Sequence, residues 1–434
     1  MKLTIDKLIY GGQGLATLPA EAGERAGMRA FVPFTLPGEV VEAEIAAVHR
    51  GYCDAQLTRV LEASPARVAA PCPWFGSCGG CQLQHAEYAL QVESKRGVLG
   101  EALRRAGLRD LPEIATLTGA PFGYRNRVRV VLQTRPHAAV GYRRAKSHEV
   151  LAIDACAIAH PRISGCMQQL AAMAQAGKLP PELREAEIFV NHDASAMILA
   201  LQADPLPGKA RLAFETFLAS LADALPALQG AMVFPAGENI GREPMLQWGR
   251  PELRYRVDGR ELRVSAGSFF QVNGTLLDAF VRAVTEGRSG ALAWDLYAGV
   301  GLFSVALAEN FARVEAVEGS PVAFADLRTN LQGHTARAHH AATLNFLRTH
   351  ARNAARRRPD LILLDPPRAG LGGEVCRLLA QIGPPSIVYV SCDPATLARD
   401  LKALIQSGYR IQTLQLVDMF PQTSHMEAIA TLTQ

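Results

Sequence analysis

The sequence predicts an α/β protein in which a doubly wound parallel sheet follows two smaller parts. From about residue 264 onward, short apolar runs alternate with helical stretches, the pattern of a sheet covered by helices on both faces. The first 60 or so residues hold short strand-like runs between turns that carry Gly and Pro. The chain has 434 residues, enough for two or three domains.

The N-terminal part is expected to form a small five-stranded barrel of the oligonucleotide-binding kind. A glycine-rich turn at 11–14 follows the first strand-like run. Strand-like runs lie at 2–9, 29–33, 39–48 and 53–61. Barrels of this kind also bind sugars or proteins, so this pattern alone leaves the function open.

The middle of the chain mixes both periodicities. A helical pattern at 84–109 and an Ala- and Leu-rich helical stretch at 209–225 accompany β-like runs at 128–132, 188–190 and 197–201. Arg125, Arg127 and Arg129 alternate along one strand-like run, so they share one face. That face is either a phosphate-binding surface or the exposed side of an edge strand.

The last part carries the strand and helix alternation of a doubly wound sheet. Its expected strands lie at 291–296, 314–317, 361–364 and 386–390, with a pair near 411–418 and 427–432. Ligands of open α/β sheets bind at the carboxyl ends of the strands. Candidate functional residues are therefore sought directly after these runs.

Composition places few limits on function. The net charge of +4 permits a nucleic-acid partner without requiring one. No apolar stretch reaches about 18 residues, and the first residues lack the apolar core of a signal peptide, so a cytoplasmic protein with reduced cysteines is expected. Two basic runs are either solvated surface or phosphate contacts: Arg143, Arg144 and Lys146, and Arg352, Arg356, Arg357 and Arg358.

One motif indicates a nucleoside cofactor. Asp295-Leu296-Tyr297-Ala298-Gly299-Val300-Gly301 follows a strand and opens a helix, where glycines allow a ligand to approach the backbone. Glu318 ends the next strand, and an acid there commonly binds ribose hydroxyls. A full dinucleotide fingerprint needs a third Gly, and the form Asp-x-Tyr-x-Gly-x-Gly suits S-adenosylmethionine best. A tight turn beside a surface Glu is the alternative.

Two further motifs stand directly after strands. Leu364-Asp365-Pro366-Pro367-Arg368 carries an Arg where methylases of exocyclic amines place an aromatic residue, which favours chemistry on a ring carbon. Tyr389-Val390-Ser391-Cys392-Asp393-Pro394 places a thiol at the mouth of the sheet. A lone Cys there is either a buried packing residue or a nucleophile.

In this order these motifs, with Phe420-Pro421-Gln422-Thr423-Ser424-His425-Met426-Glu427 and Ser268-Phe269-Phe270-Gln271-Val272-Asn273, resemble the S-adenosylmethionine-dependent RNA uracil-5-methyltransferases. The resemblance implies that Cys392 adds to C6 of uracil, so that C5 takes the methyl group, and that Glu427 is the general base. It also implies that Gln271, Tyr297, Gly299, Glu318 and Asp365 lie around the cofactor. Leu302 stands where many relatives place Asn, which affects one cofactor contact.

The N-terminal half resembles the larger members of this family, which act on 23S ribosomal RNA and carry a TRAM barrel and an iron–sulfur cluster. Cys72, Cys78, Cys81 and Cys156 match the cluster ligands. Four thiolates suit zinc or iron–sulfur, and the three-plus-one spacing with the resemblance favours a 4Fe–4S cluster. Cys53, Cys166 and Cys376 have no motif and are expected to be buried packing residues.

The expected fold is a Rossmann-like S-adenosylmethionine methyltransferase domain with an OB-like TRAM barrel and a mixed α+β iron–sulfur domain. The expected boundaries are 1–60 for an RNA-binding barrel, 61–83 with 116–262 for the central iron–sulfur domain, and 84–115 with 263–434 for the methyltransferase domain. The expected protein is a monomer that methylates C5 of a uridine in RNA, with 23S rRNA as the expected substrate, and no protein partner is implied. The alternatives are a tRNA uracil-5-methyltransferase and an inactive iron–sulfur RNA-binding protein.

Overall fold

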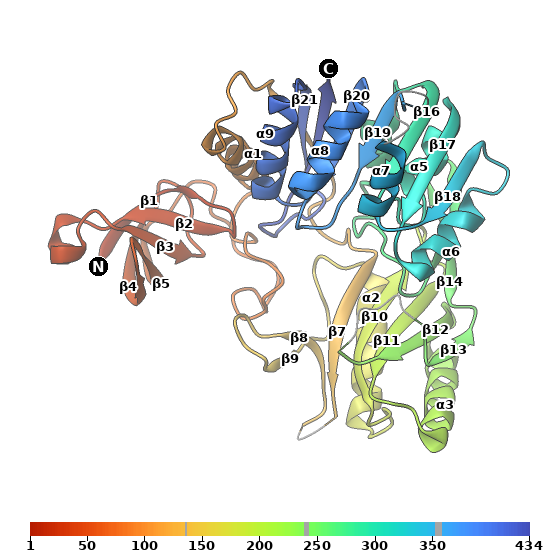
Figure 1. Cartoon of the computed structure of the whole chain (residues 1–434). Coiled ribbons are helices and arrows are strands. Elements are labelled where there is room, and N and C mark those ends of the chain that lie inside the picture. The colour runs from red at the N-terminus through yellow and green to blue at the C-terminus, as the bar shows by residue number, and fades with distance from the viewer. Residues whose placement is uncertain (135–136, 238–242, 352–357) are drawn as a thin grey trace.

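Three bodies make up the computed structural model, which describes residues 1–134, 137–237, 243–351 and 358–434. Figure 1 shows a small barrel set to one side of two larger bodies, each built on its own sheet. Arg352, Arg356 and Arg357 of the second basic run lie outside the described residues. In the described part of the chain, no helix is long and apolar enough to cross a lipid bilayer.

The barrel closes in the order β1-β2-β3-β5-β4, which confirms the predicted five-stranded barrel. Alternate residues of each strand point inward, so Leu3, Ile5, Val32 and Val41 fill its core together with Cys53. The strands are β1 (Lys2–Leu8), β2 (Gln13–Thr17), β3 (Arg29–Pro33), β4 (Val40–His49) and β5 (Tyr52–Glu62), with a 3-10 turn η1 (Ala20–Arg25) between β2 and β3.

The middle body is a seven-stranded sheet in the order β13-β12-β11-β10-β7-β8-β9. The helices α2 (Pro161–Gln175) and α3 (Gly208–Ala224) each pack an apolar face against this sheet. Cys166 of α2 is buried in the core between them and the sheet. Its strands are β7 (Arg127–Gln133), β8 (Ala139–Arg143), β9 (Val150–Ala152), β10 (Leu183–Val190), β11 (Met197–Ala203), β12 (Leu228–Pro235) and β13 (Leu246–Gly249).

The predicted basic face of Arg125, Arg127 and Arg129 is wrong. Arg127 is 6% exposed, lies 3.0 Å from Glu187, and donates to the Ser268 carbonyl at 3.0 Å. Arg125 is half-buried, whereas Arg129 is exposed. The run does not lie on a free edge, because β7 pairs with β10 on one side and with β8 on the other. Arg127 joins the middle body to the segment at 268–270, so the three arginines do not form one solvent-facing stripe.

The largest body is an eight-stranded sheet in the order β18-β17-β16-β19-β20-β22-β21-β6. The strands β16, β17, β18, β19 and β20 run parallel to one another. Strand β22 is antiparallel to both of its neighbours, β20 and β21. The strands are β6 (Ile114–Leu117), β16 (Gly290–Leu296), β17 (Phe311–Glu318), β18 (Ala336–His340), β19 (Leu361–Leu364), β20 (Ser386–Ser391), β21 (Arg410–Val417) and β22 (Glu427–Thr433).

Helices cover both faces of this sheet, which confirms the doubly wound α/β architecture. One face packs against α4 (Leu277–Thr285), α5 (Leu302–Leu307) and α6 (Pro321–Asn330). The other packs against α1 (Tyr88–Arg105), α7 (Thr343–Ala351), α8 (Gly372–Ile382) and α9 (Pro394–Gln406), and includes Cys376. α1 and β6 precede the strands of the middle body in sequence, yet β6 is the edge strand of this sheet and α1 packs against it.

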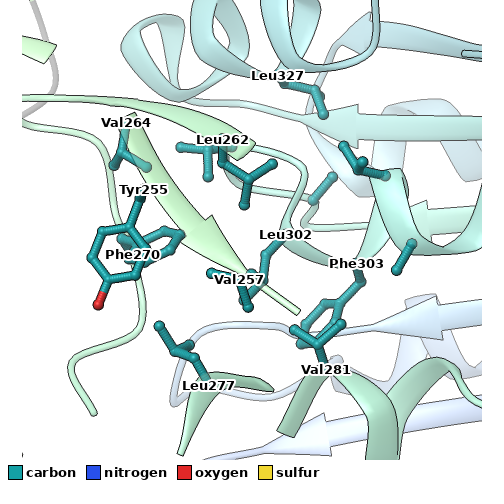
Figure 2. Close-up of a cluster of buried hydrophobic side chains, with 14 of the residues drawn as sticks. Tyr255, Val257, Leu262, Val264, Phe270, Leu277, Val281, Leu302, Phe303 and Leu327 are labelled. Atoms are coloured by element: carbon teal, nitrogen blue, oxygen red, sulfur yellow. The ribbon is translucent and has the colours of Figure 1, made fainter. Parts of the chain in front are cut away.

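A hairpin of β14 (Glu252–Val257) and β15 (Arg260–Ser265) joins the two large bodies. Figure 2 shows Tyr255 and Leu262 of the hairpin in one apolar cluster with Phe303. Phe189 of the middle sheet belongs to the same cluster. The boundary expected at 262/263 therefore falls inside β15, within a core that both bodies share.

Candidate active site

Cys392 directly follows the central strand β20 and lies two residues before α9, with Asp393 between them. The Asp393 side chain caps that helix, because its Oδ1 accepts from the backbone N–H groups of Ala395 at 3.0 Å and Thr396 at 2.9 Å. Pro394 occupies the first helical turn, where its missing N–H is not needed. This cap fixes the turn and leaves the Cys392 side chain partly exposed at the edge of the sheet.

Strand register brings Glu427 beside Cys392. Ser391 of β20 pairs with Ala428 of β22 in an antiparallel ladder, so the next residues outward on the two strands are Cys392 and Glu427. Glu427 also pairs with Val417 of β21 and is only 3% exposed. Its Oε1 atom has no hydrogen-bond partner among the residues that the structure describes, which leaves an unengaged carboxylate oxygen beside the thiol.

The electrostatics of this pair favour the neutral form of each group. Burial, followed by the nearby Asp365 carboxyl, raises the pKa of Glu427 well above its ordinary value. Burial, followed by the Glu427 carboxyl, raises the pKa of the Cys392 thiol to about 11. Arg368 acts in the opposite direction on both groups. Without a ligand, Cys392 is therefore a thiol, and Glu427 holds a proton more tightly than a free Glu does.

Arg368, which influences both groups, is held by two contacts. Its Nη2 atom lies 2.7 Å from Nδ1 of His425, and its carbonyl accepts from Thr396 Oγ1 at 3.2 Å. Burial, followed by Arg368, lowers the pKa of His425 to about 4, so the imidazole is neutral and its ring nitrogen can accept from the guanidinium. Both residues stand in motifs that the sequence identifies, but the sequence alone assigns neither of them a role.

Three of the expected cofactor residues, Tyr297, Gly299 and Glu318, lie at the carboxyl ends of β16 and β17, whereas Asp365 directly follows β19 and Gln271 lies in the loop before α4. The turn after β16 has positive φ angles at Tyr297 (66°) and Gly299 (57°), and a Tyr at such an angle is strained. Glu318 holds this turn: its Oε2 accepts from the Gly299 N–H at 2.8 Å and its Oε1 accepts from the Ser320 N–H at 2.6 Å. In this structure Glu318 therefore orders the turn that presents the glycines.

Buried polar groups lie near this turn and influence one another electrostatically. Gln271 Nε2 lies 3.4 Å from Asp365 Oδ2, a long hydrogen bond. Burial, followed by Asp295, raises the pKa of Asp365 to about 7. Asp295 accepts from Ser304 Oγ at 2.5 Å. The residues expected at the cofactor thus lie along one edge of the sheet that continues to Cys392.

Leu302, which replaces the Asn of many relatives, is buried with Phe303 in the apolar core at the start of α5. Its side chain packs into that core and therefore adds no polar group to the turn after β16.

The four cysteines with cluster-like spacing line one cavity of about 270 Å³. Trp74, Phe75, Arg125 and Tyr142 line it as well. Across the described ranges, no three His, Cys, Asp or Glu side chains are close enough to hold a metal ion. The cavity lies between the segment after the barrel and the strands β7 to β9 of the middle body, and Cys78 forms a β-bridge with Arg144.

One residue near the thiol has no sequence signal of its own. Tyr10 lies in the turn between β1 and β2 of the barrel, and its hydroxyl donates to Asp393 Oδ2 at 3.1 Å. Burial, followed by Asp393, raises its pKa to about 12. A Tyr beside a pair of glycines reads as an ordinary turn residue, so only the packing of the barrel against the large sheet identifies it.

Known proteins resemble this chain over nearly its whole length. A family model described as tRNA (uracil-5-)-methyltransferase matches residues 88–434. An uncharacterized RNA methyltransferase of Aquifex aeolicus is 34% identical and aligns over 100% of this chain and 98% of its own. The 23S rRNA (uracil(1939)-C(5))-methyltransferase RlmD of Shewanella amazonensis is 34% identical, over 99% of this chain and 94% of its own.

A solved structure covers the same length. The tRNA (uracil-54, C5)-methyltransferase of Pyrococcus abyssi, in complex with S-adenosyl-L-homocysteine, superimposes over 100% of both chains with a TM-score of 0.77 and 26% identity.

Proposed function

Because this chain belongs to the tRNA (uracil-5-)-methyltransferase family of S-adenosylmethionine-dependent RNA uracil-5-methyltransferases, we propose that it methylates C5 of a uridine in 23S rRNA through a covalent adduct on Cys392. The single observation that carries the covalent step is the strand register that sets Cys392 beside Glu427. A nucleophile and a general base must both reach one pyrimidine ring, and this register provides both from neighbouring strands.

The thiol is needed because C5 of uracil is a poor nucleophile. As Cys392 loses its proton and its sulfur bonds to C6, the C5–C6 electron pair moves toward C4 and its oxygen, forming an enolate. C5 can then take the methyl group. Arg368 favours the thiolate, because its positive charge lowers the pKa of Cys392. Since the resting thiol is protonated, thiolate formation is expected to depend on substrate binding that brings Arg368 or a proton acceptor closer.

Glu427 completes the reaction as the proposed general base. After methylation, C5 carries both a methyl group and a hydrogen, and Glu427 removes that hydrogen as a proton. The electron pair re-forms the C5–C6 double bond while the sulfur–C6 bond breaks, which returns Cys392 as a thiolate. Burial raises the pKa of Glu427, so once deprotonated its carboxylate is a stronger base than that of a solvated Glu.

The proposed cofactor site lies along the same edge of the sheet. Bound S-adenosylmethionine supplies an electrophilic methyl group on a sulfonium. Gln271, Tyr297, Gly299, Glu318 and Asp365 are proposed to hold it, because Tyr297 and Gly299 form the turn after β16 and the buried Asp365 influences both Asp295 of that strand's end and Cys392 electrostatically. The fit is electrostatic as well, since a carboxylate at Asp365 would complement a sulfonium.

We further propose that Cys72, Cys78, Cys81 and Cys156 hold a 4Fe–4S cluster. The residues fit such a group, because all four line one cavity and thiolates are the ligands of these clusters. A cluster spreads its cysteines further apart than a single ion does, so four thiols around a cavity suit it better than zinc. Methyl transfer moves no electrons, and a structural role is therefore proposed for the cluster.

The three bodies would divide the work on RNA. We propose that the barrel at 1–60 and the central part at 61–83 and 116–262 bind the RNA by shape, while 84–115 and 263–434 carry the chemistry. The target base must leave its stack to reach Cys392. Ribosomal RNA is favoured over tRNA because the similar protein from Shewanella amazonensis is named for 23S rRNA and aligns with almost the whole chain.

The experiment is tritium release from RNA labelled at uridine C5, with and without S-adenosylmethionine. The Cys392→Ala variant is expected to release none, and Glu427→Gln is expected to stall as a covalent protein–RNA adduct on a denaturing gel. Cys166→Ala, the same change at a buried Cys of the middle body, should retain release. An active Cys392→Ala variant would contradict the mechanism.

The target is tested separately. Fragments of 23S rRNA and tRNA transcripts are offered in competition, and 5-methyluridine is mapped in ribosomal RNA from a strain that lacks the gene. Preferential methylation of tRNA would favour the second candidate, a tRNA methyltransferase, which the Pyrococcus abyssi structure supports by its shape.

A further inference from the structure

The nine-residue loop between β21 and β22, residues 418–426, is held almost entirely by segments that are distant in sequence. We call it the hairpin loop. It carries His425 and leads directly into Glu427. Gln422 within it has a φ of 68°, which is unusual for a residue other than Gly. A backbone in this conformation persists only where its surroundings impose it.

Helix α1 supplies one set of these contacts. Gln91 and Gln422 exchange two hydrogen bonds: Gln91 Nε2 donates to Gln422 Oε1 at 3.0 Å, and the Gln422 N–H donates to Gln91 Oε1 at 3.0 Å. Lys95 Nζ donates to the Phe420 carbonyl at 3.0 Å. Gln91 and Lys95 are buried, so these bonds are shielded from competing water.

The cysteine-rich segment supplies a second set. The backbone N–H groups of Gln82 and Leu83, the two residues after Cys81, both donate to the Gln422 carbonyl, at 3.1 Å and 3.0 Å. The Gln82 side chain reaches both ways. Its Oε1 accepts from the Ser424 N–H at 3.1 Å, and its Nε2 donates to the Gly79 carbonyl at 3.0 Å, between Cys78 and Cys81.

The barrel meets the same point. A Cβ atom on Gly12, in the turn between β1 and β2, would stand 2.8 Å from Gln82 Cβ and 3.3 Å from Ser424 Cβ. Such a distance is too short for a real contact, so only a Gly allows the barrel turn to pack here. Gln82 therefore lies where the barrel, the cysteine-rich segment and the hairpin loop come together.

We propose that Gln82 is a positioning residue that ties the cysteine-rich segment to the hairpin loop, so that the four-cysteine cavity supports the placement of Glu427. This inference rests on the proposed function, because it takes Glu427 as the general base and the cysteines as ligands of a structural group. Loss of the tie loosens the loop three residues before Glu427. The base step then slows more than the addition of Cys392 to C6.

Two variants and a control test this. Gln82→Met keeps the length of the side chain and removes both of its hydrogen bonds. Gln82→Glu keeps the acceptor for the Ser424 N–H and loses the donor to Gly79. Gln133→Met is the control, because Gln133 makes one side-chain bond, to the His137 carbonyl at 3.1 Å, at a distance from the hairpin loop.

Two RNA substrates separate the steps. RNA with 5-fluorouridine at the target traps the adduct after methyl transfer, because fluorine cannot leave as a cation, and so reports only the steps before the base acts. On uridine RNA, Gln82→Met is expected to turn over about 5- to 10-fold more slowly, the equivalent of about one lost hydrogen bond, and to accumulate adduct. It should trap 5-fluorouridine at the wild-type rate, and Gln82→Glu should lie between Gln82→Met and wild type.

Hydrogen exchange gives a readout that needs no activity. Amides of residues 418–426 should exchange faster in Gln82→Met, and also in Cys81→Ser, than in the wild type or in Gln133→Met. Unchanged exchange in both variants, wild-type turnover of Gln82→Met, or an equal fall in trapping and turnover would overturn the proposal. Failure of the wild type to trap 5-fluorouridine would instead refute the proposed function, so the two failures are distinguishable.

Discussion

Replacement of Lys95 by Met is expected to destabilise the large sheet strongly. Lys95 Nζ lies 2.6 Å from Asp418 Oδ1, and the two side chains are 3% and 0% exposed. Asp418 Oδ2 has no hydrogen-bond partner in the described part of the chain. Lys95→Met therefore leaves a buried carboxylate without its cation, and breaking a buried pair in this way costs about 3–5 kcal/mol.

The magnitude can be measured by thermal unfolding. For a body of this size, about 3 kcal/mol corresponds to a fall in the unfolding midpoint of roughly 6–12 °C. The double variant Lys95→Met with Asp418→Leu removes both charges and should recover most of that loss, because a well-packed apolar pair is often as stable as an ion pair. Exposed Lys2 and Glu62, 4.0 Å apart, provide the control pair, and Lys2→Met is expected to change stability by less than about 1 kcal/mol.

Whether the losses in unfolding free energy from the two single replacements add up tests whether Lys95 and Asp418 are coupled. If the two single replacements at 95 and 418 sum to the double within about 0.5 kcal/mol, the residues are not coupled. The buried ion pair would then have no energetic importance, and the account of how α1 supports the hairpin loop would be refuted.

Three more predictions follow from the same geometry. Burial raises the pKa of Asp295 to about 7, so its contribution to folding stability is full below about pH 4 and is lost as pH rises through 7. The unfolding midpoint of Asp295→Asn should therefore fall less between pH 5 and pH 8 than that of the wild type. An identical fall in both proteins would contradict this. Gly11→Ala and Gly12→Ala both place Ala at positive φ, and each should lower the free energy of unfolding by about 1–2 kcal/mol. Only Gly12→Ala should also slow methylation, because its Cβ would meet Gln82. Equal methylation rates for the two variants would argue against that contact. Cys156→Ser should lower the iron content of an anaerobic preparation, measured by a chelator assay, whereas Cys166→Ser should not; a colourless wild type that contains zinc would overturn the cluster assignment.

Local sequence patterns predict much of this fold, because the spacing of apolar residues along one strand or helix shows which of its faces is buried. The alternation in residues 1–60 indicates the barrel strands, and the strand ends after 291–296 and 386–390 locate the turn of Tyr297 and the thiol of Cys392. Motif order with the resemblance then points to Glu427. These signals suffice because strand ends in a parallel sheet meet at one edge.

Contacts between distant segments are not predictable in this way. Lys95 pairs with Asp418 across 323 positions, and a Lys in a helical pattern reads as a solvated residue. The arginines at 125, 127 and 129 alternate as an exposed face would, but Arg127 is buried because it bonds to Glu187 of β10 and to the segment at 268–270. Tyr10 and Gln82 lie in turns whose sequence carries no sign of what packs against them.

The interruption of the large sheet by the middle body has a consequence for synthesis on the ribosome. α1 and β6 leave the exit tunnel early, but β6 pairs with β21, which begins at Arg410. The barrel and the seven-stranded sheet can each complete their pairing from nearby residues, whereas the helix bearing Gln91 and Lys95 must wait until about 300 further residues have been translated. During that interval its apolar face is open to chaperones and proteases, so a slowly translated message should lower the yield of the catalytic body more than that of the other two.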